Sequence, residues 1–359
     1  MKKILKVVLC SLMVLLAACN DSKQGADSKE KYGCDVLNIY NWGEYIGENV
    51  VRNFEKEYNV KVTYSLYGSN EEMYTKLLGG SQYDVLVPSD YMIERLIKEN
   101  LLQSLDLDKI TNFSNLTEGV QNWSFDPNHE YSIPYFWGTV GIIYDTNVIA
   151  SADVEAQGWN IFHDEKYKGQ SIAMYDSERD AFMMALKALG YSMNTEDEGE
   201  IEAAYQWLLE ADSKVNLAYV QDEIIDGMIT GEFVLANVYS GDAAYMLYEN
   251  EDLAFFLPEQ GTNIWVDSMV IPANAKCPAL AHEFINYILT YDASLDNSQT
   301  VGYTSSHAEV ITELSGEDGD YYENNAYLPR TDYEKDEVFK NNEVLKKKLS
   351  DLWIKVKNQ

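Results

Sequence analysis

Four short stretches of the chain each place aromatic rings beside a carboxylate. They are WGEY at 42–45, SDY at 89–91, YSGD at 239–242 and WVD at 265–267. Aromatic faces attract cations, and carboxylates accept the hydrogen bonds of an ammonium group once water is stripped away. These residue types predict a site for an organic cation. Glu44, between Trp42 and Tyr45, is the first candidate acid.

A di- or polyamine suits this chemistry. An ammonium group over an aromatic face contributes roughly 0.5–2 kcal/mol. The methylene stem buries against the same rings at about 0.8 kcal/mol per CH₂. Carboxylates at both ends would fix the length of the ligand. Because an unpaired buried carboxylate is costly, we expect the empty site to open and to close on its ligand.

The elements that must position these residues alternate along the chain. Strand patterns at 35–42, 60–66 and 83–89 alternate with helical patterns at 48–58, 69–80 and 90–100. This order favours a largely parallel, doubly wound α/β sheet. Ligands of such sheets bind beyond the carboxyl ends of strands, and three of the four aromatic–acid stretches follow predicted strands.

A second α/β unit of similar make-up follows the stretch SIPYFWGTVGIIYD. Its strand patterns are at 215–220, 233–240 and 265–272, and a last helix is predicted over 337–357. The joints between the units are expected near residues 138 and 266. A chain of 359 residues is long enough for two such domains.

Composition and motifs exclude several functions. The formal net charge of −32 repels phosphate backbones, so we expect no nucleic-acid partner. The chain lacks the glycine-rich loops of nucleotide sites, an H-E-x-x-H metal motif and the G-x-S-x-G elbow of hydrolases. We therefore predict no cofactor, no metal and no catalysis. An acid pair of the glycosidase kind stays open as an alternative, because 59 acids always offer pairs.

The N-terminus predicts export. Basic residues precede an apolar run that ends at LAAC, residues 16–19. This end resembles the lipobox of bacterial lipoproteins, which implies cleavage before Cys19 and a diacylglycerol on its thiol. Residues 20–34 read as a flexible tether. We expect the mature protein to be anchored outside the cytoplasmic membrane without spanning it.

Several longer motifs resemble one family, the spermidine/putrescine-binding proteins of bacterial polyamine ABC importers. The matching stretches are IYNWGEYI, GSNEEMYTKLLGG, YDVLVPSDYM, DKITNFSNL, YSIPYFWGT, ALGYSMNT, WVDSMVIPANAK and VGYTSS. The resemblance implies a two-lobed periplasmic-binding-protein fold (type II, Venus-flytrap) with the ligand between the lobes. Lobe 1 would comprise 35–138 plus 267–311, and lobe 2 would comprise 139–266 plus 312–359. It also implies a monomer that delivers its ligand to a membrane permease.

Carried over position by position, the resemblance implies a set of ligand-binding residues. Glu44, Asp180 and Asp267 would take the ammonium groups, and aromatic or hydroxyl residues would line the site. The full set is Trp42, Glu44, Tyr45, Ser89, Tyr91, Asp180, Tyr239, Trp265, Asp267 and Tyr303. Ser177 holds a neighbouring position where an acid can also occur. For Tyr239 and Tyr303, core packing is an equal alternative.

Two residues depart from the family pattern. Tyr239 stands where a tryptophan can stack on the ligand, and Lys340 stands near where an amide can help to bind it. A lysine there would repel a cation unless it turns outward. Asp222 and Asp242 are possible compensating acids, but helix N-capping is the favoured role for both and for Asp90.

The remaining cysteines are Cys34 and Cys277. An exported pair is a disulfide candidate, and two buried thiols are the alternative. If Asp267 lies at the ligand site, the strand DSMVIP carries Cys277 to the far pole of lobe 1. Cys34 begins the strand that reaches the site at Trp42, so it starts at the same pole.

Two further alternatives stay open for the chain as a whole, namely the same fold with another cargo and a secreted hydrolase of glycans.

Overall fold

The computed structural model of the protein describes residues 28–358. The predicted signal peptide, Cys19 and the first part of the predicted tether lie outside these residues. The last part of that segment packs on the body of the protein: residues 28–32 form a helical turn, and the Ser28 hydroxyl donates to the backbone oxygens of Tyr58 and Asn59.

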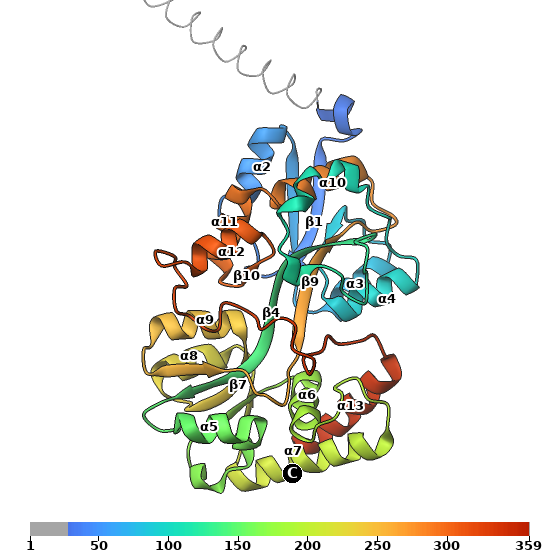
Figure 1. Ribbon diagram of the computed structural model, residues 1–359. Helices are drawn as coiled ribbons and strands as arrows, with labels where there is room; N and C mark the ends of the chain where they lie inside the picture. Colours follow the sequence, from blue (N-terminus) through green and yellow to red (C-terminus); the bar gives the residue numbers. More distant parts are fainter. Residues whose placement is uncertain (1–27, 359) are drawn as a thin grey trace, which may run out of the picture.

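The described chain folds into two lobes, one above the other in Figure 1, that are joined by long strands. Lobe 1 carries β1 (Val36–Trp42), α2 (Val50–Tyr58), β2 (Lys61–Tyr67), α3 (Asn70–Leu78), β3 (Val85–Leu86), α4 (Asp90–Lys98), α10 (Pro278–Ile288), α11 (Tyr291–Val301), β10 (Thr304–Ser305) and α12 (Ala308–Ser315). Lobe 2 carries α5 (Ser151–Gln157), β5 (Ala173–Tyr175), α6 (Glu178–Ala188), α7 (Glu198–Val215), β6 (Ala218–Val220), α8 (Glu223–Thr230), β7 (Leu235–Tyr239), α9 (Ser240–Glu249), β8 (Leu253–Phe256) and α13 (Glu343–Val356). Short 3₁₀ helices fill the loops between them: η1 (Leu107–Lys109), η2 (Thr111–Asn115), η3 (Glu118–Val120), η4 (Gly158–His163) and η5 (Glu165–Tyr167).

One long strand, β4 (Ser132–Asp145), belongs to both lobes. Its first half pairs with β9 (Ile264–Val270) and β10, and its second half pairs with β7 and β8. The main sheet therefore runs in the order β10-β4-β9-β3-β1-β2, with β7 and β8 also on β4. Because β4 and β9 pass between the lobes side by side, side chains on their shared face lie where the lobes meet (Figure 1).

The prediction of a largely parallel sheet is correct for part of the protein only. Strands β1, β2 and β3 are parallel to one another, as the alternation of strands and helices predicts. The strands that pair with β4 are antiparallel to it, as is β9 against β3. Long-range pairings of this kind connect segments about ninety residues apart or more, and local periodicity carries no information about them.

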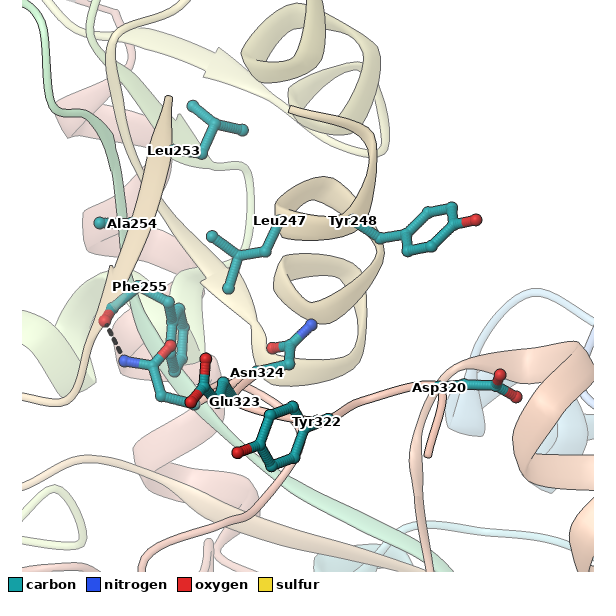
Figure 2. A pocket seen from close by; sticks show the side chains of 10 residues that line it. Leu247, Tyr248, Leu253, Ala254, Phe255, Asp320, Tyr322, Glu323 and Asn324 are labelled. Atoms are coloured by element: carbon teal, nitrogen blue, oxygen red, sulfur yellow. Dashed lines mark hydrogen bonds between the residues drawn. The ribbon is translucent and has the colours of Figure 1, made fainter. Parts of the chain in front are cut away.

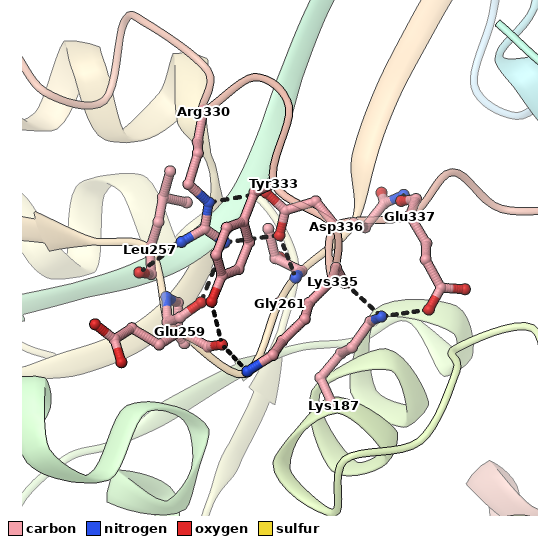
Figure 3. Close-up of polar contacts among 12 residues, drawn as sticks. Lys187, Leu257, Glu259, Gly261, Arg330, Tyr333, Lys335, Asp336 and Glu337 are labelled. Atoms are coloured by element: carbon pink, nitrogen blue, oxygen red, sulfur yellow. Dashed lines mark hydrogen bonds and ion pairs between the residues drawn. The ribbon is translucent and has the colours of Figure 1, made fainter.

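A third connection between the lobes is the strap, residues 316–342, between α12 and α13. We expected helix from residue 337, but α13 begins only at Glu343, where the Asn342 side chain accepts a bond from the Leu345 amide and caps the helix. Figure 3 shows how the strap is tied to lobe 2. Arg330, which pairs with Asp336 inside the strap, donates to the Leu257 and Pro258 oxygens of lobe 2. Lys187 of lobe 2, only 3% exposed, donates to the Lys335 oxygen and pairs with Glu337.

A disulfide joins Cys34 and Cys277, whose Cα atoms are 6.0 Å apart. The two cysteines precede β1 and α10 at the pole of lobe 1 far from lobe 2 (Figure 1). The strand-direction argument therefore favoured the correct alternative.

We expect the double variant Cys34→Ser/Cys277→Ser to lose about 2–5 kcal/mol in free energy of unfolding, because the cross-link restricts the unfolded chain. Urea unfolding without reductant measures the loss. Wild-type protein that is reduced while unfolded and refolded in reductant is the control, and it should match the variant. An unchanged urea midpoint after reduction would contradict the prediction.

Candidate ligand-binding site

Asp267 is the acid most firmly placed between the two lobes. It lies in the middle of β9 and is 7% exposed. The Tyr45 hydroxyl donates a hydrogen bond of 2.8 Å to its Oδ2 atom, and the backbone of Ser89 forms an isolated bridge with that of Asp267. Three of the residues predicted for the site thus meet from three separate segments of the chain.

The predicted aromatic residues form a ring cluster beside Asp267. Trp265 lies on the same face of β9, two residues earlier. Its ring meets that of Tyr303 edge to face at 5.1 Å between centroids and that of Tyr239 at 6.3 Å. Tyr303 in turn lies 5.8 Å from the Tyr45 ring. The cluster therefore joins residues from both lobes and from a crossing strand.

Two glycines allow these rings to come so close. Gly138 on β4 is paired with Trp265, and a Cβ atom there would lie 2.6 Å from the indole ring. A Cβ atom at Gly241, the second residue of α9, would lie 1.7 Å from the Tyr303 ring. Any larger residue at either position would push the rings apart.

Asp180 lies in the first turn of α6 and is 4% exposed. The Tyr239 hydroxyl donates to its Oδ2 atom at 2.8 Å, which connects this acid to the ring cluster. Ser177, the other candidate position in this turn, caps the helix through its hydroxyl oxygen, which accepts from the Asp180 amide at 3.4 Å. The structure thus gives the two neighbouring positions different roles.

Asp242, which the predicted set lacks, also contacts the ring cluster. Its Oδ1 atom accepts a hydrogen bond of 3.0 Å from the Tyr303 hydroxyl. The capping role favoured from sequence is wrong here, because neither α9 nor α8 has a side-chain cap bond at its N-terminus. Asp222 instead accepts from the Tyr175 hydroxyl at 2.9 Å. The sequence signal for Asp242 was its position just after a predicted strand.

Asp90 is also no cap of the ordinary kind. It is 1% exposed in the first turn of α4, where its Oδ1 atom accepts from the amide of the next residue, Tyr91. Its Oδ2 atom accepts from the Val266 amide at 3.3 Å, so the carboxylate lies against the crossing strand β9.

Several predicted residues stay outside the ring cluster. Glu44 is exposed, on a turn with a left-handed φ of 49°. Trp42 ends β1, where its indole N–H donates to the Val87 oxygen at 2.9 Å and its ring packs on that of Tyr67. Tyr91 is joined to Ser89 indirectly, because the Asn70 amide donates to both hydroxyls.

Lys340, the basic residue that put one end of the site in doubt, is exposed. Its backbone N–H donates to the Asn194 side chain at 2.9 Å, which holds this part of the strap on lobe 2. The departure at Lys340 therefore adds no buried cation to the site.

Burial raises the pKa values of the four enclosed acids, which are Asp267, Asp242, Asp90 and Asp180. It raises the pKa of Asp267 to about 6 and those of Asp242 and Asp90 to about 7. Hydrogen bonds from Ser89 and Tyr45 oppose the rise at Asp267. Burial also raises the pKa of Asp180. Carboxylates that are removed from water and met only by hydroxyl and amide donors favour a cation between them.

Two open hollows lie elsewhere on the protein. One, of about 590 Å³, is on the outer side of lobe 2, where Figure 2 shows Tyr248 and Tyr322 beside it. Another, of about 940 Å³, lies between the strap and the loop around Trp123. Within residues 28–358 no cluster of three or more His, Cys, Asp and Glu residues is arranged to hold a metal ion. In the same range, no helix has the length and apolarity needed to cross a membrane.

The two lobes, the crossing strands and the enclosed acids are features of a solute-binding protein. The sequence pattern of the bacterial extracellular solute-binding protein family matches residues 49–327, and the chain belongs to this family. The spermidine/putrescine-binding periplasmic protein of Salmonella typhimurium is 38% identical over 285 residues, which cover 79% of this chain and 81% of that relative.

Solved structures agree with this assignment. The spermidine/putrescine ABC transporter substrate-binding protein of Streptococcus pneumoniae is 35% identical and superposes with a TM-score of 0.79, covering 90% of this chain and 98% of that one. A lipoprotein of Treponema pallidum is 30% identical with a TM-score of 0.78, covering 90% and 99%. The predicted two-lobed α/β fold is confirmed.

We expect Asp267→Asn to stabilise the ligand-free protein at pH 8. The pKa of Asp267 is higher in the folded than in the unfolded protein, so folding favours the protonated form. The cost of its charge is absent below pH 4 and complete above pH 6. A rise from 3.8 to about 6 corresponds to roughly 3 kcal/mol as an upper bound.

Urea unfolding at pH 8 and pH 4 after removal of bound ligand measures this difference, which should vanish at pH 4. Asp318→Asn, at an exposed acid, is the matched control and should change neither value. A variant that is less stable than wild type at pH 8 would show that the carboxylate stabilises the empty protein.

Proposed function

We propose that the protein binds a linear di- or polyamine, spermidine or putrescine, between its lobes and delivers it to the permease of an ABC importer. The observation that carries this proposal is the enclosure of Asp267, Asp180 and Asp242 around one cluster of aromatic rings, each acid met by a tyrosine hydroxyl. The names of the relatives in Salmonella typhimurium and Streptococcus pneumoniae support the same ligand class.

The arrangement suits an amine in three ways. Each ammonium group has three N–H donors, and a carboxylate that already accepts one hydroxyl bond has lone pairs left for them. The faces and edges of Trp265, Tyr239 and Tyr303 offer apolar surface to the methylene chain. The acids come from a crossing strand and from lobe 2, so an amine held among them draws the lobes together.

The residues at the edge of the cluster have outer roles in this proposal. Glu44 takes an ammonium from the turn after β1, beside Trp42 and Tyr45. Ser89 orients Asp267, and Tyr91 lines the wall of lobe 1. The lobes open and close by a hinge in the crossing strands. The two lobes have the residue boundaries expected from sequence. Binding is reversible and involves no catalysis.

The exported form completes the proposal. The signal sequence and Cys19 support a lipid-anchored monomer on the outer side of the cytoplasmic membrane, with the permease as its protein partner. Globomycin, which blocks the lipoprotein signal peptidase, would cause the unprocessed precursor to accumulate if Cys19 is the lipid site. An unchanged mature mass would oppose the anchor.

Calorimetric titration of protein that has been unfolded and refolded to remove carried-over ligand tests the amine site. We expect a Kd near 1 μM, about −8 kcal/mol, for putrescine or spermidine. Asp267→Asn and Asp180→Asn should each weaken binding by about 2–5 kcal/mol, because a buried ammonium would lose its charged partner.

Glu44→Gln, at an exposed acid, should weaken binding less than the two buried acids do. Glu323→Gln, in the outer hollow of Figure 2, is its matched control and should leave the affinity unchanged. Absence of heat with putrescine, cadaverine, spermidine and spermine would refute the amine proposal and direct the search to another cargo.

Amine affinity should fall as the pH is lowered. Protons compete with the ligand for carboxylates whose pKa values in the empty protein are about 6 and about 7, whereas primary amines stay charged over this range. We expect the association constant for putrescine to fall at least about tenfold from pH 8 to pH 5. A constant that does not change over this range would mean that binding does not need ionised carboxylates.

A further inference from the structure

Arg179 places a positive charge of the protein itself at one end of the site. It precedes Asp180 in the first turn of α6, in lobe 2. Its guanidinium carbon lies 3.5 Å from the centre of the Tyr91 ring, which belongs to α4 in lobe 1. The ring of Phe339, from the strap, lies 5.8 Å from the same atom. The charge is therefore held between aromatic rings of the two lobes.

Two other arginines form ion pairs with carboxylates, and in the described chain Arg179 does not. Arg95 pairs with Glu99 and Glu343, and Arg330 pairs with Asp336. Within residues 28–358 no carboxylate forms an ion pair with Arg179, and its buried Nη1 atom has no hydrogen-bond partner. Its charge acts on the site at longer range. Burial raises the pKa values of Asp90 and Asp180, and Arg179 partly offsets both rises.

A cation over an aromatic face uses the surface that an ammonium group would use. Tyr91 was predicted to line the ligand site, yet its ring already carries the guanidinium group. A second positive charge beside it would be repelled, and the repulsion is stronger than in water because the surroundings are partly dry. An amine is thereby kept from the Tyr91 end and is left with Asp267, Asp242 and Asp180, and with Glu44 at the exposed edge.

We propose that Arg179 determines the specificity of the site by excluding a further ammonium group from the Tyr91 end, so that it limits the length and charge of the amine. The inference rests on the proposed amine binding and adds a residue to it. A role in holding the lobes closed is the competing account, since Tyr91 and Arg179 come from different lobes.

Two other interlobe contacts separate these accounts. Lys346 on α13 pairs with Glu71 on α3, and Glu343 on α13 pairs with Arg95 on α4. They join α13 of lobe 2 to α3 and α4 of lobe 1, whereas Arg179 joins α6 to α4. Neither ion pair covers an aromatic face that was predicted for the ligand. A variant of Arg95 therefore removes one of these interlobe contacts and leaves the charge at Tyr91 in place. Lys346 is less suitable, because its partner Glu71 also interacts with Arg179.

The test compares putrescine, spermidine and spermine, which carry two, three and four amino groups, by calorimetric titration of ligand-free protein. Arg179→Met keeps an apolar side chain against Tyr91 and Phe339 and removes the charge. We expect it to raise the ratio of the association constants for spermine and putrescine at least about tenfold, or about 1.4 kcal/mol. Arg179→Lys, which keeps the charge, and Arg95→Met, which removes an interlobe contact, should leave that ratio within about threefold of wild type.

A ratio that Arg179→Met changes by less than about threefold would overturn the inference, including the case in which all three amines weaken equally, as a role in closure predicts. Circular dichroism and urea unfolding would establish that the variants fold. Absence of any amine binding by wild-type protein would refute the proposed function, and the inference with it. Binding by wild type with an unchanged ratio would refute the inference alone.

Discussion

Carboxylates enclosed between two lobes are the constraint on which the rest of this structure depends. Asp267 lies in the middle of a crossing strand, where water is excluded, and no lysine or arginine forms an ion pair with it in the described chain. Hydroxyl donors such as Tyr45 orient the carboxylate, but they do not balance its charge. The folded protein therefore keeps a buried acid at the expense of its own stability, and in the proposed function a bound cation offsets that cost. Buried groups with perturbed pKa values concentrate at functional sites for this reason.

The backbone around these acids lets aromatic rings approach it closely. Alternation along β9 turns Trp265 and Asp267 to one face, and the partner strand β4 provides Gly138 opposite the indole ring. Gly241 gives the same clearance to Tyr303 at the start of α9. Since β4 pairs with strands of both lobes, a movement of one lobe relative to the other must bend or twist the strands that carry the site. Ligand contact and lobe position are coupled through that one strand.

The sequence predicted where strands end better than it predicted which side chains meet between the lobes. The strand ends at Trp42 and Tyr239 were correctly placed, because short buried strands followed by helices have clear local patterns. The strand expected to reach Ser89 ends at Leu86. Asp242 was assigned to a helix cap, because an acid in the first turn of a helix fits that role equally well without tertiary information. Antiparallel pairing on β4 and the contact between Tyr91 and Arg179 join distant segments, so no local pattern could predict them. The disulfide was accessible only because the directions of two strands could be argued from the site outward.

The strap shows how an irregular segment can serve the same site. Residues 337–342 have helix-forming neighbours, yet they stay extended because the chain is fixed at both ends of this stretch. Glu337 is paired with the buried Lys187, and Asn342 begins α13 as its cap. Between these two points the strap carries Phe339 to the guanidinium group of Arg179 and leaves Lys340 at the surface. A helix over the same residues would break the bonds that the Lys340 amide and the Val338 oxygen make to Asn194. The extended conformation therefore keeps the Phe339 ring near the guanidinium group of Arg179. It also keeps the charge of Lys340 at the surface, away from the buried acids.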